Sequence, residues 1–249
     1  MQAKVTDPGR WLRCFNPMPS APRRLICLPH AGASASYYFA LAKALCRSVD
    51  VVVIQYPGRQ DRYSEPCRES IAELAEEITT VVRPLADRPL AFFGHSMGAV
   101  LAFEVARPLE AEGIVLTGLF ASGRRAPSMH RDERIHLRDD EGLIAEVRTL
   151  SGTDAQLFED EEIMRMVLPA IRSDYKAVET YRYQPGPDLS CPIFALIGTD
   201  DSKVTVDEAR AWARHTRGEF RLSTFSGGHF YLNSCLPEVV EQLAEHLGV

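Results

Sequence analysis

The sequence predicts an α/β fold, in which a mostly parallel central sheet is flanked by helices and a helical insertion precedes the last two strands. Two observations support this prediction. Short, almost continuously apolar runs alternate with segments of helical periodicity, which is typical of parallel strands that are buried on both faces. One junction between such a strand and a helix contains Gly94-His95-Ser96-Met97-Gly98, a turn in which small residues surround a serine.

The composition is that of an ordinary globular protein. The chain has 249 residues, of which 45% are hydrophobic and 25% are charged, enough for one large α/β domain. No apolar run approaches the roughly 18 residues of a membrane span, and the first residues lack the apolar region of a signal peptide, so we expect a cytoplasmic protein. The net charge of -6 argues against a nucleic-acid partner. Six cysteines without C-x-x-C spacing predict free thiols rather than disulfides or a metal site.

Three strands are expected up to the serine turn, after a proline-rich and irregular segment over residues 1–23. They run from Arg24 to Pro29, from Val49 to Tyr56 and from Leu90 to the turn, with a helix over 69–82 before the third. The first strand ends in the small-residue loop 30–36. This loop could donate the Ala31 N–H to a substrate oxygen, or it could simply be a tight turn ahead of a helix over 37–45. The residues alone leave both interpretations open.

The second half of the chain predicts three more strands and one long insertion. The strands cover 113–122, 191–198 and 220–225, with helices over 206–215 and 237–247. Between the strands over 113–122 and 191–198, residues 123–190 show helical periodicity and no convincing strand. We therefore expect an α/β core over 1–122 and 191–249 and a helical lid over 123–190, the alternative being a core-packing helix pair. One helix face of the insertion is predicted to carry Ile163, Met166, Val167, Ala170, Ile171, Asp174, Tyr175, Val178 and Tyr181.

The glycine-x-serine-x-glycine turn is the nucleophile elbow of the α/β-hydrolase fold when a strand precedes it and a helix follows it, as the pattern predicts here. A strained turn would project the Ser96 hydroxyl above the edge of the sheet. The positive end of the following helix favours negative charge on a substrate oxygen, which makes the Met97 N–H a candidate oxyanion donor. The alternative is an ordinary strand-to-helix turn in which Ser96 does no chemistry.

The residues that could activate Ser96 follow later strands. His229 comes after two glycines at the end of the last strand, and either Asp200 or Asp201 follows the strand before it. This gives the order serine, aspartate, histidine of α/β-hydrolases, in which the imidazole takes the serine proton and the carboxylate orients the imidazole. In many hydrolases the acid stands three residues after a strand-ending glycine and three before a valine, and we favour Asp201 because Gly198 and Val204 give it that spacing. Asp200 would then be a turn residue.

Taken in order, the motifs resemble the type II thioesterases of polyketide synthase and nonribosomal peptide synthetase pathways. The resemblance covers nearly the whole chain and rests on residues 25–34, 56–59, 94–98, 168–175 and 227–230. It implies an editing enzyme that hydrolyses stalled acyl groups from the phosphopantetheine arm of carrier proteins. It also implies a triad of Ser96, Asp201 and His229 and oxyanion donors at Ala31 and Met97. Ala33, where the family often has glycine, is a departure.

The resemblance further implies acyl or peptidyl carrier proteins as partners, with no cofactor, metal, nucleic acid or membrane, and we expect a monomer. The chemistry would be that of a serine thioester hydrolase with an acyl-enzyme intermediate. The alternatives with the same triad are a general carboxylesterase or lipase and a chain-releasing fatty-acyl thioesterase. A non-catalytic scaffold that binds carrier proteins is the alternative from another class.

Arginines at the start of the insertion are a candidate docking surface for an acidic carrier protein. If their segment is helical, Arg131, Arg134 and Arg138 share one face. The alternative is a solvated arginine face neutralised by Asp132, Glu133 and the acidic residues that follow.

Overall fold

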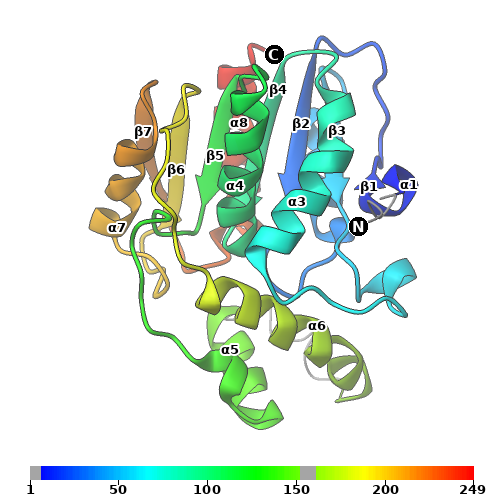
Figure 1. Cartoon of the computed structure of the whole chain (residues 1–249), viewed down its shortest axis with the longest axis vertical. Coiled ribbons are helices and arrows are strands. Elements are labelled where there is room, and N and C mark those ends of the chain that lie inside the picture. The colour runs from blue at the N-terminus through cyan, green and yellow to red at the C-terminus, as the bar shows by residue number, and fades with distance from the viewer. Residues whose placement is uncertain (1–6, 152–160) are drawn as a thin grey trace.

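A parallel sheet forms the centre of the computed structural model, which describes residues 7–151 and 161–249 (Figure 1). Within the described residues the sheet has seven strands in the order β1-β3-β2-β4-β5-β6-β7, and all neighbours pair in parallel except β1 with β3. The strands are β1 Leu12–Arg13, β2 Arg23–Leu28, β3 Val49–Ile54, β4 Leu90–His95, β5 Gly118–Ser122, β6 Ile193–Gly198 and β7 Phe220–Phe225. The predicted fold class is confirmed.

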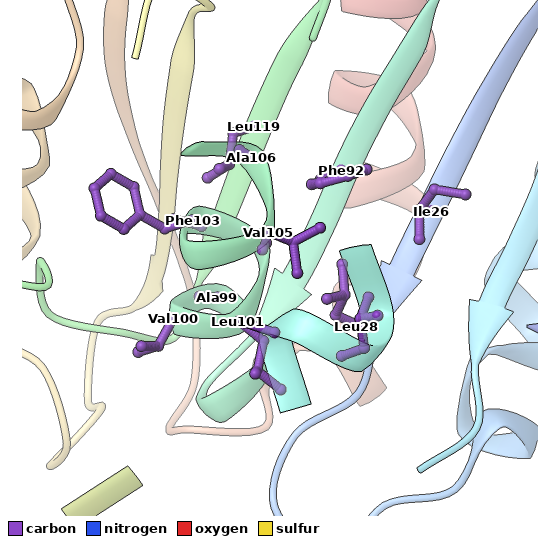
Figure 2. Packing of buried hydrophobic residues seen from close by; sticks show 14 of the residues in the cluster. Ile26, Leu28, Phe92, Ala99, Val100, Leu101, Phe103, Val105, Ala106 and Leu119 are labelled. Atoms are coloured by element: carbon purple, nitrogen blue, oxygen red, sulfur yellow. The ribbon is translucent and has the colours of Figure 1, made fainter. Parts of the chain in front are cut away.

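Both faces of the sheet are covered, which explains the continuous apolar runs in the sequence. Successive side chains of β2 alternate between two clusters: Ile26 and Leu28 pack with α3 and α4, whereas Leu25 and Cys27 pack with α2 and α8. Figure 2 shows the first cluster, in which α4 lies on β2, β4 and β5. Burial of each large apolar side chain stabilises the fold by about 1.5–3 kcal/mol relative to exposure.

The helices lie in two layers and one separate group. The layers contain α2 Phe39–Leu45, α3 Ile71–Val82, α4 Met97–Ala111 and α8 Leu236–Leu247, while α1 Pro8–Trp11 and α7 Val206–Arg210 lie at the two edges of the sheet. Short 3-10 helices are η1 Ala35–Tyr38, η2 Gln60–Arg62, η3 Arg83–Leu85, η4 Ile135–Leu137, η6 Ala211–His215 and η7 Tyr231–Asn233. No helix among the described residues is long and apolar enough to cross a membrane.

The separate group lies between β5 and β6 in the chain and consists of η4, α5 Asp140–Ser151 and α6 Glu161–Thr180. Figure 1 places α5 and α6 beyond the end of the sheet to which the strand arrows point. These helices form a small apolar cluster of their own, made by Ile135, Leu143, Val147, Met164, Leu168 and Ile171. Three of the acidic residues that follow the arginines in the sequence, Asp154, Glu159 and Asp160, lie outside the described residues.

The predicted face of α6 is partly wrong. Ile163 and Met166 are about half exposed, whereas Met164 and Leu168 are buried. The reason is that α6 packs against α5 and η4 on one side and against α4 on another, so two stripes of the helix are buried instead of one.

Three boundaries also differ from the sequence prediction. The N-terminal segment is not wholly irregular, because β1 pairs with the edge of β3. The fourth predicted strand starts only at Gly118, since the residues after α4 first complete the turn around Gly113, whose φ is 85°. The helix predicted over 206–215 divides into α7 and η6.

Candidate active site

Ser96 occupies a strained turn between β4 and α4. Its backbone has φ 54° and ψ -114°, and apart from Gln60 it is the only non-glycine residue with positive φ in the described part of the chain. A residue other than glycine adopts this conformation only where its surroundings enforce it. The Ser96 N–H donates to the Ser122 carbonyl oxygen at 2.8 Å, which fixes the turn against the end of β5.

The two glycines of the elbow are required by close backbone approach. A Cβ on Gly98 would lie 1.9 Å from the carbonyl oxygen of Leu28, and a Cβ on Gly94 would lie 2.2 Å from the carbonyl oxygen of Gly98. Real Cβ atoms do not come this close to backbone. The elbow therefore packs directly on the end of β2, which brings Ser96 next to the loop that follows β2.

His229 and Asp201 are in direct contact. The Nδ1 atom of His229 lies 3.0 Å from Oδ1 and 2.9 Å from Oδ2 of Asp201, and both side chains are almost fully buried. Asp201 Oδ1 also accepts a hydrogen bond of 2.8 Å from the Lys203 N–H. The carboxylate is thus held by the turn that follows β6 and can orient the imidazole of His229.

Asp200, the other sequence candidate, is exposed and takes a different part. Its side chain accepts a hydrogen bond from the Thr199 hydroxyl at 3.1 Å, and its N–H donates to the Gly227 carbonyl oxygen at 2.9 Å. The backbone of Asp200 therefore ties the loop after β6 to the loop that carries His229. The contact between Asp201 and His229 agrees with the preference for Asp201, and Asp200 is the turn residue of the loop.

Ser96 and His229 line one small cavity of about 40 Å³, called here the Ser96 cavity. Its lining residues come from the loop after β2, the elbow, the segment between β5 and η4, the helices α5 and α6 and the loops after β6 and β7: His30, Ala31, Ser96, Arg124, Glu133, Leu150, Tyr175, Val178, Glu179, Lys203, His229 and Phe230. The insertion thus contributes part of the wall. A larger groove of about 700 Å³ between α3, α4 and the end of α6 does not include Ser96.

One wall of the Ser96 cavity is charged. Burial opposes ionisation of Glu133, but a hydrogen bond and the charge from Arg125 and the charge of Lys203 outweigh it, so the pKa of Glu133 is lowered to about 2. The buried Arg124 guanidinium makes no ion pair with any described residue, and burial, followed by the nearby charge of Arg125, lowers its pKa. At this wall the Glu133 carboxylate pairs with Arg125 and Lys203, whereas Arg124 lies beside them without an ion pair among the described residues.

Two histidines beside the site were not assigned a chemical role from sequence. His95 is fully buried, and its Nδ1 atom forms a hydrogen bond of 2.8 Å with Ser122 Oγ. Ser122 Oγ in turn lies 2.6 Å from the Tyr231 hydroxyl oxygen. The His95 ring lies 5.0 Å from that of His229 and 5.6 Å from that of His30. Burial, then the proximity of His229 and His30, lowers the pKa of His95 well below its usual range, so His95 is neutral. No sequence signal short of the fold could pair these residues.

The two expected oxyanion donors are both available. Among the described residues, neither the Ala31 N–H nor the Met97 N–H has a hydrogen-bond acceptor, although Met97 is fully buried. Ala31 also lines the Ser96 cavity. Ala33, the departure from the family pattern, donates its N–H to the His30 carbonyl oxygen at 3.1 Å and so closes the loop on itself.

The arginines considered as a docking surface do not share a helix face. Arg131 and Arg134 precede η4 and Arg138 follows it, so the segment is not the single helix that a shared face would require. Each arginine is paired with a carboxylate, Arg131 with Glu208, Arg134 with Asp132 and Arg138 with Glu146. These pairs agree with the alternative interpretation of a neutralised surface.

Comparisons with known proteins agree with this geometry. The family model described as "Thioesterase domain" matches residues 23–247. The chain is 51% identical to Thioesterase PikA5 of Streptomyces venezuelae over 97% of this chain and 86% of that protein. It is 34% identical to the gramicidin S biosynthesis protein GrsT of Aneurinibacillus migulanus, over 98% of this chain and 96% of that protein.

Among solved structures, the type II thioesterase BorB from the borrelidin biosynthetic cluster superposes with a TM-score of 0.92 at 53% identity, covering 98% of this chain and all of that chain (100%). The type II thioesterase YbtT from the yersiniabactin pathway superposes with a TM-score of 0.83 at 28% identity, covering 95% of this chain and 97% of that chain. The chain therefore belongs to the thioesterase domain family, and its predicted resemblance to the type II thioesterases is confirmed.

Proposed function

We propose that this enzyme is an editing thioesterase that removes stalled acyl groups from the phosphopantetheine arm of carrier proteins. The observation that carries the proposal is the Ser96 cavity, in which a serine on a strained elbow faces the same space as a histidine bound to Asp201. Relatives named for borrelidin, yersiniabactin and gramicidin S biosynthesis support carrier-bound substrates. The partners would accordingly be acyl or peptidyl carrier proteins.

In the first half of the reaction Ser96 Oγ attacks the thioester carbonyl carbon while His229 Nε2 takes the hydroxyl proton. Asp201 holds the Nδ1–H tautomer of His229 and stabilises the imidazolium. The free N–H groups of Met97 and Ala31 would bind the oxyanion of the tetrahedral intermediate. The carbon–sulfur bond then breaks, the thiolate receives the proton from His229, and the acyl group remains as an ester on Ser96.

In the second half water attacks the ester carbonyl carbon and gives a proton to His229. The bond to Ser96 Oγ breaks, the proton passes to that oxygen, and the free acid leaves. The proton that Ser96 loses leaves with the thiol, and a proton from water replaces it, so Ser96 and His229 end the cycle in their starting protonation states and the scheme uses no metal or soluble cofactor. We also infer that residues 123–190 act as a lid on the core of 1–122 and 191–249, because Leu150 of α5 and Tyr175 of α6 line the Ser96 cavity.

Mass spectrometry of a propionyl carrier protein before and after incubation tests the proposal, with Ser96→Ala as the matched variant. The parent should release the acyl group, whereas Ser96→Ala should lose about 10⁴-fold or more in turnover while keeping its fold, because only the nucleophile is removed. Activity of the variant within about tenfold of the parent would remove Ser96 from the mechanism. Faster turnover of an oxygen ester of the same acyl chain would instead identify a carboxylesterase.

A further inference from the structure

We propose that Asp174 and Arg59 are positioning residues that hold the oxyanion loop, defined as residues 30–34, in the shape that presents the Ala31 N–H to substrate. The inference rests on the proposed function, because it takes this loop as the source of an oxyanion donor. Neither residue lines the Ser96 cavity. Asp174 belongs to α6, so the inference also gives the insertion a part in the chemistry.

Asp174 and Arg59 form a bidentate ion pair inside the protein. Arg59 Nη1 lies 2.7 Å from Asp174 Oδ2 and Arg59 Nη2 lies 2.9 Å from Oδ1, and the two side chains are 6% and 1% exposed. Such a pair costs desolvation energy that its own attraction roughly offsets, so it is weak support for stability as such. Its geometry fixes the orientation of both groups.

Both partners bind the oxyanion loop directly. Asp174 Oδ2 accepts the Gly32 N–H at 2.7 Å, and Arg59 Nη1 donates to the Ala33 carbonyl oxygen at 3.1 Å. Gly32 has φ 78°, and a Cβ there would lie 2.6 Å from Ile171 Cγ1 on α6. The loop is thus held against α6 at the residue that follows Ala31.

The other side of Ala31 is held as well. The Tyr56 hydroxyl donates to the Pro29 carbonyl oxygen at 3.0 Å, and the Arg59 guanidinium lies 5.2 Å from the centre of the Tyr56 ring. The peptide group that carries the Ala31 N–H therefore lies between two peptide groups that side chains bind. Its own N–H has no acceptor among the described residues, which leaves it for a ligand oxygen. A preorganised donor of this kind contributes to the rate because it need not reorient during the reaction.

The test uses a double variant that removes the pair without leaving a buried charge. Arg59→Met with Asp174→Leu should fold, because replacing a whole buried ion pair with apolar residues is often neutral in stability. The Gly32 N–H and Ala33 carbonyl lose their partners, so the loop is released. We expect kcat for propionyl-N-acetylcysteamine and p-nitrophenyl propionate to fall by about 10²-fold while KM changes by less than about threefold.

An inhibitor pair gives a readout that a purely structural role would not change. A trifluoromethyl ketone forms an oxyanion when a serine adds to it, whereas the methyl ketone of the same chain remains largely unreacted. The double variant should bind the trifluoromethyl ketone about 10²-fold more weakly and the methyl ketone equally well. Arg59→Lys keeps the charge but lacks the planar fork that bonds both oxygens of Asp174 and the Ala33 carbonyl at once, so it serves as a milder second variant with about a tenfold loss in kcat.

The matched control is the buried pair of Arg24 and Asp50, joined at 2.8 Å at the amino ends of β2 and β3 and so at the opposite end of the sheet. Arg24→Met with Asp50→Leu should leave kcat and both inhibitor affinities unchanged. A folded Arg59 and Asp174 double variant with kcat within about threefold of the parent, or an unchanged trifluoromethyl ketone affinity, would overturn the inference alone. A parent that is inactive on both small substrates would overturn the proposed function, and this inference with it.

Discussion

The two adjacent aspartates after β6 differ in their surroundings. Asp201 is buried against His229, whereas Asp200 is exposed on the same turn. The preference for Asp201 came from its spacing to Gly198 and Val204, which matches the position of the acid in many hydrolases, and the contact with His229 agrees with it. A fold-specific spacing can thus separate neighbouring residues that carry the same functional group.

Substitution of the two aspartates tests the assignment. Asp201→Asn should reduce kcat by about 10⁴-fold, because an amide cannot hold the Nδ1–H tautomer of His229 or stabilise the imidazolium. Asp200→Asn should reduce it by less than about threefold, since the backbone contact with Gly227 remains. The measurement is kcat for a small thioester in both variants, and the reverse ranking would give the role of the acid to Asp200.

The contacts of other residues in and beside the site could not be predicted from the sequence. Asp174 lies on a face that the periodicity predicts as apolar, and a buried carboxylate there requires a partner. The sequence carries this signal, but Arg59 is more than a hundred positions earlier in the chain, and only the fold brings the two together. The contact of His95 with Ser122 and Tyr231 is of the same kind.

Among the secondary structure elements, the strands were predicted best. Strands β2, β3, β4 and β6 occur where apolar runs predict them, because a parallel strand covered on both faces carries apolar side chains at nearly every position. The edge strand β7 also occurs in its predicted range, although only Phe225 of it is buried. The helix α6 was predicted less well, since its two buried stripes face different partners. The pairing of β1 with β3 was missed because so short a strand carries no periodicity.

The elbow depends on the fit of α4 against β2, and a glycine pair tests that fit. Gly98→Ala should lower the free energy of unfolding by about 3 kcal/mol, because the new Cβ would overlap the Leu28 carbonyl oxygen and backbone would have to move. Gly113→Ala is the matched control: its φ is 85° but no atom lies within 4 Å of the new Cβ. That change should cost about 1 kcal/mol, the usual cost of a side chain in left-handed backbone.

Urea unfolding of the two variants measures these losses. Equal losses would mean that the contact of the new Cβ with Leu28 costs no more than a side chain in left-handed backbone, because Gly98 lies in α4 and has no positive φ. A larger loss for Gly98→Ala would support a rigid junction between the elbow and β2, which keeps Ser96 beside the oxyanion loop.

At the scale of the whole molecule, the sheet gathers three histidines in its interior at the carboxyl ends of its strands. His95 is surrounded by His30, His229, Ser122 and Tyr231, and no carboxylate among the described residues bonds to its ring. Burial, then the two neighbouring imidazoles, lowers the pKa of His95. Burial and the charges of His229 and Arg59 likewise lower the pKa of His30 to about 3. Folding therefore requires these rings to stay neutral.

This requirement predicts the stability of the molecule in acid. In the unfolded chain both rings titrate near 6.5, so below that pH the unfolded state binds more protons than the folded state. The free energy of unfolding should have its full value above about pH 6.5 and should decrease as the pH falls below about 6.5. Each ring adds up to about 1.4 kcal/mol per pH unit to this slope.

His95→Asn removes one of these rings while its side-chain amide can still reach Ser122. Between pH 6 and pH 4, urea unfolding of this variant should show a slope that is lower than that of the parent by up to about 1.4 kcal/mol per pH unit. The exposed His130 supplies the control, and His130→Asn should leave the slope unchanged. Parallel curves for His95→Asn and the parent would mean that His95 takes up its proton inside the folded protein. The acid sensitivity of the fold would then have to come from its carboxylates, such as Glu133, whose pKa of about 2 places their loss of stability at a lower pH.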